Sequence, residues 1–258
     1  MIEDIMELFK YKEMLKNLVR KDLRTRYKGS FLGFLWTFIN PLLMLLVYSI
    51  VFPYLLRIQE KNYAMFLFVA LIPWMFFSTS LQNGVNSIVW NNGLIKKIYF
   101  PRLILPIATA TSGLMNCIYS MIVVIISLMI MDVSIKWYVI FLPLLLFIQY
   151  LLVLGFCIIF SCINVYFRDL EHILGIVLQA WYFLTPVLYR VDVLPKNLQF
   201  ALKLNPMSAL IISYRDVLYD GKFPNVMSLV YVFIFSIFLL IFSILIFNKL
   251  KIRFAEEI

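Results

Sequence analysis

The chain has 258 residues, of which 63% are hydrophobic and only 14% are charged, and its mean hydropathy is +0.92. Soluble domains carry about 25% charged residues, so this composition cannot cover a surface that faces water. It excludes a soluble globular protein and predicts an integral membrane protein. The net charge of +9 then indicates basic groups that face anionic lipid headgroups, and not a nucleic-acid footprint.

Apolar windows between the charged residues are long enough to cross a bilayer. A spanning helix needs about 20 apolar residues, whereas a β-barrel shows short segments in which apolar and polar residues alternate. Residues 120–131 (SMIVVIISLMIM) do not alternate, so the spans are predicted to be helices. We expect an all-α integral membrane protein with six spans, at about 34–56, 64–85, 106–131, 137–163, 172–189 and 226–247.

The distribution of Lys and Arg in the loops sets the predicted orientation. Six spans place both termini on one side of the membrane, and the segments on that side carry fifteen Lys and Arg, against eight on the other. The excess of basic residues predicts that both termini are cytoplasmic and that the protein is a multi-pass protein of the inner or plasma membrane. A charged segment precedes Phe34 and no small-residue cleavage site follows it, so no removable signal peptide is expected.

A basic amphipathic helix is predicted before the first span. Between Tyr11 and Lys28 a basic residue recurs every four positions, and apolar residues form the complementary stripe. Such a helix is suited to the headgroup plane. It is either a plain topology anchor or an element that transmits movement from a cytoplasmic partner through Gly29 and Gly33. The expected domains are 1–33, a cytoplasmic segment with this interface helix, and 34–258, the transmembrane domain.

Two short loops on the cytoplasmic side combine apolar and charged residues. Residues 91–106 read NNGLIKKIYFPRLILP. This stretch mixes apolar and basic residues and is punctuated by Pro101 and Pro106, which predicts a short helix lying across the membrane face. That helix either docks a partner or is an ordinary basic turn. Residues 164–172 (NVYFRDLEH) hold the only histidine, His172. A catalytic acid–base cluster is the less economical interpretation there, because residues two apart on a helix point in different directions.

The extracytoplasmic stretch 190–224 carries signals for two short helices. Asn205 can cap a helix and Pro206 can occupy its first position, and an apolar stripe then continues to Leu218. An earlier helix is expected over 195–204. The two helices either plug the end of the bundle or act as gate helices over an exit.

Neither metal-binding nor ATP-binding patterns are present in the sequence. The three cysteines lie inside predicted spans without metal-ligand spacing, which is typical of packing residues. The only Gly-Lys pair is Gly221-Lys222, and Asp216 stands where the phosphate-binding loop needs its first glycine. We therefore expect any ATP to be bound by another chain.

Several short motifs follow the basic helix in a distinctive order. They are Asn40-Pro41, Ile72-Pro73-Trp74, Phe100-Pro101-Arg102, Tyr166-Phe167-Arg168-Asp169, Phe183-Leu184-Thr185-Pro186, Leu194-Pro195 and Leu204-Asn205-Pro206. In this order and spacing, over nearly the whole chain, the sequence resembles the permease subunits of ABC-2 type polysaccharide exporters. These proteins export lipid-linked O-antigen, wall teichoic acid or capsular polymer, and some serve lipopolysaccharide biosynthesis.

The resemblance implies a half-transporter that forms a homodimer and pairs with two copies of an ABC ATPase subunit. ATP and Mg²⁺ would be bound by that partner, so the chain itself would be a transport permease with no catalytic residue, cofactor or metal. The N-terminal helix, the 91–104 segment and the 168–172 turn would contact the ATPase. The residues that this assigns to coupling or gating are Lys96, Lys97, Tyr99, Phe100, Pro101, Arg102, Arg168 and Asp169.

A path for a polymer of sugars needs aromatic and amide side chains, because sugars offer ring faces and hydroxyl groups. Gln179, Tyr182, Pro186 and Tyr189 are spaced by three, four and three residues, which predicts a shared face of the fifth span. An aromatic stripe also serves packing or the interfacial belt. The candidate channel-lining residues are Trp36, Asn40, Gln179, Tyr182 and Tyr189.

Three other functions are weighed against polysaccharide export. A membrane-embedded glycan transferase needs buried acids, bases or metal ligands, and an ion-coupled protein needs ionisable residues inside its spans. The charge-free spans argue against both. An ABC-2 permease for a drug or a lipid is the closer alternative, because the fold does not fix the cargo.

Overall fold

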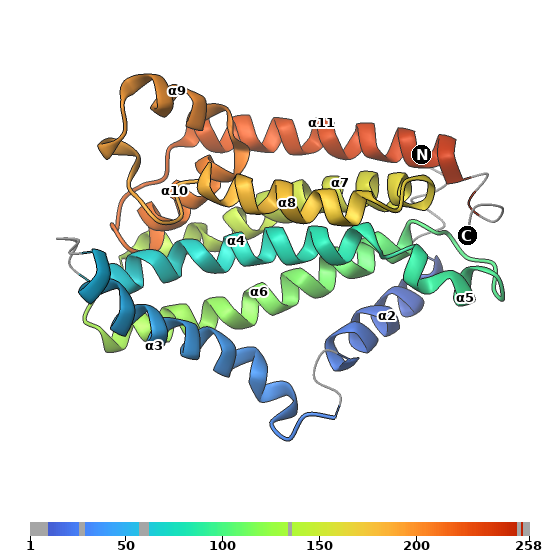
Figure 1. Cartoon of the computed structure of the whole chain (residues 1–258), viewed down its shortest axis with the longest axis horizontal. Coiled ribbons are helices and arrows are strands. Elements are labelled where there is room, and N and C mark those ends of the chain that lie inside the picture. Colours follow the sequence, from blue (N-terminus) through green and yellow to red (C-terminus); the bar gives the residue numbers. More distant parts are fainter. Residues whose placement is uncertain (1–9, 26–28, 57–61, 134–135, 252–253, 255–258) are drawn as a thin grey trace.

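The computed structural model describes residues 10–25, 29–56, 62–133, 136–251 and 254. Every regular element within these ranges is a helix, as predicted. The long helices lie side by side and run in alternating directions along one axis, so they form a bundle (Figure 1).

Four helices are long and apolar enough to cross a membrane. They coincide with the predicted second, third, fourth and sixth spans, because a helix that satisfies its own backbone hydrogen bonds needs only apolar side chains to enter lipid. They are α4 (Tyr63–Val85), α6 (Ile104–Ile130), α7 (Leu142–Tyr166, after the short 3-10 helix η3, Trp137–Phe141) and α11 (Val226–Leu250).

The first and fifth predicted spans are helical, but only the first has the predicted length. α3 (Trp36–Leu56) has 21 residues. α8 (Leu170–Phe183) has 14 residues and stops short of the predicted end at residue 189. It stops because Pro186 lacks an N–H group and disfavours helical geometry at Thr185. The count of six spans stays a prediction.

α4 forms the centre of the bundle. Of its most apolar window, 83% is buried, against 28% for α11, and α3, α6, α7, α8 and α10 (Pro206–Leu218) pack around it. Glycines allow these close approaches: a Cβ atom on Gly84 would lie 2.6 Å from the Cys157 Sγ atom, and one on Gly113 would overlap the Ser80 hydroxyl. Without a hydrophobic force between helices in lipid, such small-residue contacts decide which helices pair.

A chain of buried hydrogen bonds joins α4, α7 and α10. Gln149 Nε2 on α7 donates to the carbonyl of Pro73 on α4 (2.7 Å), and the Tyr214 hydroxyl on α10 donates to Gln149 Oε1 (2.8 Å). These pairings matter because a buried polar group without a partner costs about 1 to 3 kcal/mol. α10 is thereby fixed inside the bundle.

The segment between α8 and α11 contains both predicted short helices, α9 (Lys196–Leu204) and α10. The Asn205 side chain accepts a hydrogen bond from the Met207 N–H group (3.0 Å) and Pro206 opens α10, as the sequence predicts. α10 is not a surface amphipathic helix, however. All of its residues except Ile212 and Asp216 are buried, because it inserts against α4 and α7.

The predicted amphipathic helix is present as α2 (Lys12–Thr25), and the continuation to Lys28 lies outside the described residues. α2 crosses α6 obliquely, and the Ser112 hydroxyl donates a hydrogen bond to the Asp22 carboxylate. Tyr11 and Phe254 belong to one apolar cluster. The first and last described parts of the chain therefore lie at the same end of the bundle (Figure 1).

Candidate functional site

The loop between α4 and α6 is a hooked segment and not a continuous helix. η2 (Val89–Asn91) and α5 (Asn92–Ile95) form short helical turns, and the chain then turns through residues 96–99. The prediction of a helix across 91–104 is therefore correct only for its first residues. Pro101 explains the difference, because a proline keeps the residue before it extended.

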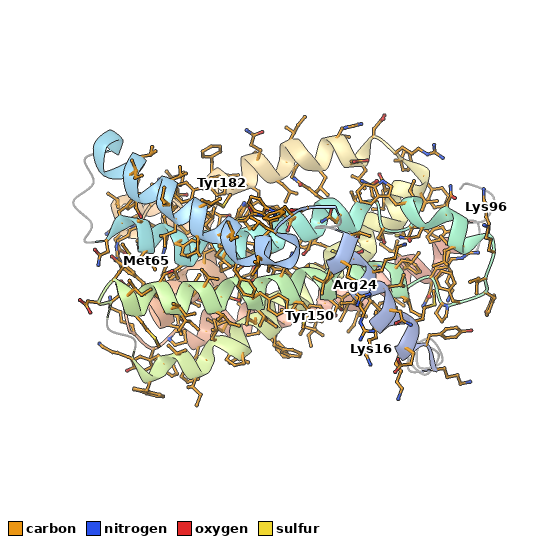
Figure 2. The ribbon with its side chains drawn as sticks, turned by 90° about the horizontal axis from the view of Figure 1, so that it is seen from below. Lys16, Arg24, Met65, Lys96, Tyr150 and Tyr182 are labelled. Carbon is orange, nitrogen blue, oxygen red and sulfur yellow. The ribbon has the colours of Figure 1, made fainter. Side chains whose placement is uncertain are left out.

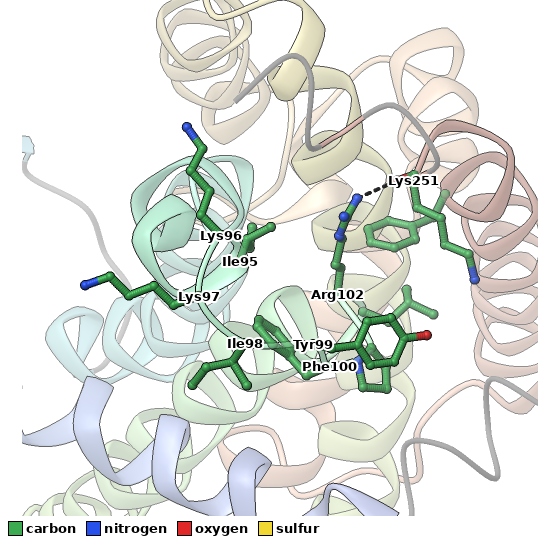
Figure 3. A pocket seen from close by; sticks show the side chains of 11 residues that line it. Ile95, Lys96, Lys97, Ile98, Tyr99, Phe100, Arg102 and Lys251 are labelled. Atoms are coloured by element: carbon green, nitrogen blue, oxygen red, sulfur yellow. Dashed lines mark hydrogen bonds between the residues drawn. The ribbon is translucent and has the colours of Figure 1, made fainter.

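The side chains of this loop divide into an exposed and a buried group. Lys96, Lys97 and Tyr99 are exposed, and Tyr99 is 83% exposed. Phe100 is buried against Phe247. The loop borders a hollow of about 450 Å³, and Figure 3 shows the two lysines extending outward from it. The hook thus exposes two cations at the surface, while Phe100 is buried behind them.

Arg102 connects this loop to the end of α11. Its Nη1 atom donates to the Lys251 carbonyl (2.5 Å; Figure 3). Its guanidinium lies 5.8 Å from the Phe254 ring centroid. A cation at a helix C-terminus is favourable because the last carbonyls lack partners. The Tyr11 hydroxyl donates to the Tyr99 carbonyl (3.4 Å), so the loop also meets the start of α2.

The second predicted contact lies beside the first. Arg168 and Asp169 are exposed in the turn between α7 and α8. In the same turn, the Tyr166 hydroxyl donates to the Leu250 carbonyl (2.9 Å). Both loops are therefore bound to the last turn of α11, and all eight predicted coupling residues lie at one end of the bundle.

A hollow of about 170 Å³ lies between α3, α4 and α6, and it is lined by both Trp36 and Asn40. The sequence analysis missed Thr79, Asn116 and Ser120, which also line it. Asn116 and Ser120 are four residues apart in an apolar window, and that spacing could have indicated a polar face. The Asn116 Oδ1 atom has no hydrogen-bond partner among the described residues. Such a hollow is polar enough to hold water.

The predicted shared face of the fifth span is wrong in part. Pro186 and Tyr189 follow the end of α8, so helical spacing does not apply to them. Gln179 is exposed, and the half-buried Tyr182 ring lies 5.5 Å from the Trp74 ring. The Tyr189 hydroxyl donates to a backbone carbonyl at the end of α8 (3.0 Å).

Arg215 is a buried cation that the sequence analysis missed. Its Nη1 atom donates to the carbonyls of Pro186 (2.5 Å) and Tyr189 (3.1 Å), and its Nη2 atom donates to Val187. Its Nε atom donates to the Phe66 carbonyl (3.3 Å), and the guanidinium lies 3.6 Å from the Phe66 ring centroid. One cation thus fixes the turn after α8 against α4. In the sequence, the signal for this role was a single arginine among the apolar residues of α10.

Charged groups gather next to Arg215, at the end of the bundle where α4 begins. Arg190 forms a two-point ion pair with Asp220, with N–O distances of 3.0 and 3.2 Å. Burial, together with the nearby Asp220, raises the pKa of Asp216 to about 6. Over the described ranges, no group of three His, Cys, Asp or Glu side chains is placed to hold a metal ion.

The family of this chain follows from its sequence matches. Residues 13–219 match the ABC-2 type transporter family, and the chain belongs to that family. The chain is 37% identical, over the full length of both proteins, to the O-antigen export system permease protein RfbA of Myxococcus xanthus. It is 35% identical to RfbA of Klebsiella pneumoniae, over 95% of this chain and 94% of the relative. The polysialic acid transport protein KpsM of Escherichia coli is 27% identical, over 88% and 89%.

Proposed function

We propose that this chain is the transmembrane permease subunit of an ABC transporter that exports a lipid-linked cell-surface polysaccharide across the cytoplasmic membrane. The cargo is an O-antigen, a teichoic acid or a capsular polymer. The observation that carries the proposal is the 37% identity to an O-antigen export permease over the whole of both chains. The energy comes from ATP and Mg²⁺ on a separate ATPase subunit, and the chain is a transport component without catalytic residues.

The proposed topology has six spans and cytoplasmic termini. Residues 1–33 form the cytoplasmic segment with the interface helix α2, and residues 34–258 form the transmembrane domain, in which α3 and α8 supply the first and fifth spans. The fifteen basic residues on the terminal side, against eight on the other, support this orientation. The shared bundle end of the first and last described residues supports an even number of passes.

The proposed ATPase surface is the bundle end that holds the two loops. Exposed Lys96, Lys97 and Tyr99 contact the ATPase together with Arg168 and Asp169. Behind them, Phe100, Pro101 and Arg102 carry movement to α6 and α11. The support is physical: the Arg102 hydrogen bond to α11 and the burial of Phe100 make the hook rigid, so a displacement of its tip moves helices and is not absorbed by a loose loop.

The proposed path lies between two copies of the chain, which pair with two ATPase subunits. Trp36 and Asn40 supply an aromatic and an amide group at the hollow beside α3. Gln179, Tyr182 and Tyr189 supply the same chemistry along and after α8. α9 and α10 act as gate helices at the exit. Aromatic rings and amides suit sugar faces and hydroxyls better than charges do.

An ABC-2 permease for a drug or a lipid is the main alternative, and a membrane-embedded glycan transferase is a weaker one. Family membership alone does not separate these cargoes. The relatives are an O-antigen export permease and a polysialic acid transport protein, and both favour a polysaccharide.

The proposal is tested by purifying the chain alone and after co-expression with its cognate ABC ATPase subunit. We expect no ATP hydrolysis by the chain alone, and a stable complex that hydrolyses ATP. Deletion of the gene is expected to abolish surface polysaccharide, and the wild-type gene is expected to restore it. Glycosyl transfer by the isolated chain, or normal surface polysaccharide after deletion, would contradict the proposal.

A further inference from the structure

A concave basic surface runs along α2 and faces α6. Lys16, Arg20 and Arg24 line one side of a groove of about 570 Å³, and Met115 and Tyr119 of α6 line the other. A second hollow of about 570 Å³ continues along α2, and Arg20 and Arg24 line both. Figure 2 shows Lys16 nearer than Arg24 to the bundle end at which the termini lie.

The groove has an excess of positive charge. Lys16, Arg20 and Arg24 are four residues apart, so they lie on one face of α2. Glu13 is 4.0 Å from Lys16, with both side chains largely exposed, and Asp22 faces α6, where its carboxylate accepts a hydrogen bond. Among the residues that the structure describes, no carboxylate forms an ion pair with Arg20 or Arg24. The groove is therefore suited to an anion.

The floor of the groove is apolar. Val19 and Leu23 contribute from α2, and Met115 and Tyr119 contribute from α6, a helix that is long and apolar enough to cross a membrane. Both α6 side chains are half-buried, so they form an apolar wall of the groove. An occupant that satisfies both the cations and this floor is an amphiphile with an anionic head and an apolar tail.

We propose that this groove binds one anionic phospholipid of the inner leaflet. Its phosphate lies between Arg20 and Arg24, and an acyl chain lies against Met115 and Tyr119. The occupant is a resident lipid and not the cargo, because the three cations of the groove all lie on α2, at the outside of the bundle (Figure 1), whereas the residues proposed for the cargo path are uncharged. Gly33, just before α3, also lines the groove, so the lipid fixes α2 relative to the first span. The inference rests on the proposed orientation but not on the cargo.

The test titrates the full chain, purified in detergent, with phosphatidylglycerol or phosphatidylcholine and counts bound lipids by native mass spectrometry. We expect the wild type to retain one phosphatidylglycerol selectively. Arg20→Gln with Arg24→Gln is expected to weaken that binding about thirtyfold, because two basic contacts with an anionic headgroup are lost. Lys12→Gln with Lys249→Gln removes the same charge from exposed positions outside the groove, and its binding is expected to stay within about twofold of the wild type.

A charge-preserving variant keeps the test decisive if the glutamine variant does not fold. Arg20→Lys with Arg24→Lys is expected to retain selective binding, and loss of selectivity there would overturn the proposal. Equal binding of phosphatidylcholine, an unaffected glutamine variant, or an equally affected control would also overturn it. Displacement of the lipid by excess inorganic phosphate, by the ATPase subunit or by an equimolar polyprenyl diphosphate would assign the groove to that ligand instead.

Failure of this inference and failure of the proposed function are distinguishable. Normal export with no selective phospholipid binding rejects only the proposed lipid site. Selective phospholipid binding by a chain that exports no polysaccharide rejects only the proposal that the cargo is a polysaccharide.

Discussion

Arg215 shows how a single side chain can hold two segments of an apolar bundle together. Its planar guanidinium donates to the carbonyls of Phe66, Pro186, Val187 and Tyr189. Arginine suits this position because its donors project in a fixed fork, whereas lysine has one compact ammonium on a flexible stem. A cation in such a place is favourable only when its donors are satisfied.

Replacement of Arg215 by Met is expected to destabilise the protein by about 2 to 4 kcal/mol, because several buried carbonyls lose their donor at once. Replacement by Lys is expected to recover less than half of that loss. The melting temperature in detergent measures the effect, and Lys196→Met, at an exposed position, is the control. A melting temperature of Arg215→Met within 1 °C of the wild type would contradict the assigned role.

The raised pKa of the Asp216 carboxyl group predicts that stability depends on pH. Burial and the nearby Asp220 raise its pKa from 3.8 to about 6, so the folded state binds the proton more tightly than the unfolded state does. Stability is therefore expected to fall as the pH rises from about 4 to about 6 and to level off above that. Because the side chain is only partly buried, we expect the free energy of unfolding to fall by about 1 to 2 kcal/mol over this range. Melting curves of Asp216→Asn should lack this component, and an unchanged pH profile in that variant would refute the assignment.

At the scale of elements, small residues decide how closely the helices of this bundle pack. α4 and α6 approach at Gly113 and Ser80, and α4 and α7 approach at Gly84 and Cys157. Van der Waals contact is the main attraction between helices in lipid, so a side chain added at such a place separates the backbones.

Gly113→Ala is expected to lower the free energy of unfolding by about 1 to 3 kcal/mol, because the new Cβ atom overlaps the Ser80 hydroxyl. Adding Ser80→Ala removes that oxygen and is expected to restore most of the stability. Gly175→Ala on α8 is the matched control, since no atom lies within 4 Å of the added carbon. Thermal unfolding of the wild type, Gly113→Ala, Ser80→Ala, the double mutant and the control measures the coupling, and an additive double mutant would show that the contact does not limit packing.

At the scale of the whole molecule, segments far apart in the sequence converge on the last turn of α11. Arg102 binds the Lys251 carbonyl there, and Tyr166 binds the Leu250 carbonyl. A partner that pushes on either loop therefore acts on one assembled surface. The hollow beside α3 and the buried α10 both border α4, the central helix of the bundle.

Lys96→Glu combined with Lys97→Glu is expected to reduce ATPase activity in the complex, and polysaccharide export, by about tenfold or more, because reversed charges oppose a partner surface that is matched to cations. Folding should be unaffected, since both side chains are exposed. Lys196→Glu with Lys222→Glu makes the same charge change at the other end of the bundle and is expected to leave ATPase activity unchanged. Normal assembly and export by the Lys96 and Lys97 double variant would remove these residues from the coupling surface.

The sequence by itself determined the elements that local chemistry controls. Four apolar windows became long helices because lipid requires each segment to satisfy its own backbone, which makes length and composition sufficient signals. The basic helix α2 and the Asn205 cap followed from spacing within a few residues. The family was also visible in the order of short motifs.

Only the tertiary structure decided what depends on contacts between distant residues. The burial of α10 and the carbonyl partners of Arg215 arise where that arginine meets Phe66, 149 positions away in the sequence. The pairing of Trp36 with Asn116 in one hollow depends on how α3 packs against α6. Hydropathy and periodicity describe one helix at a time, so they cannot report which faces of two helices meet.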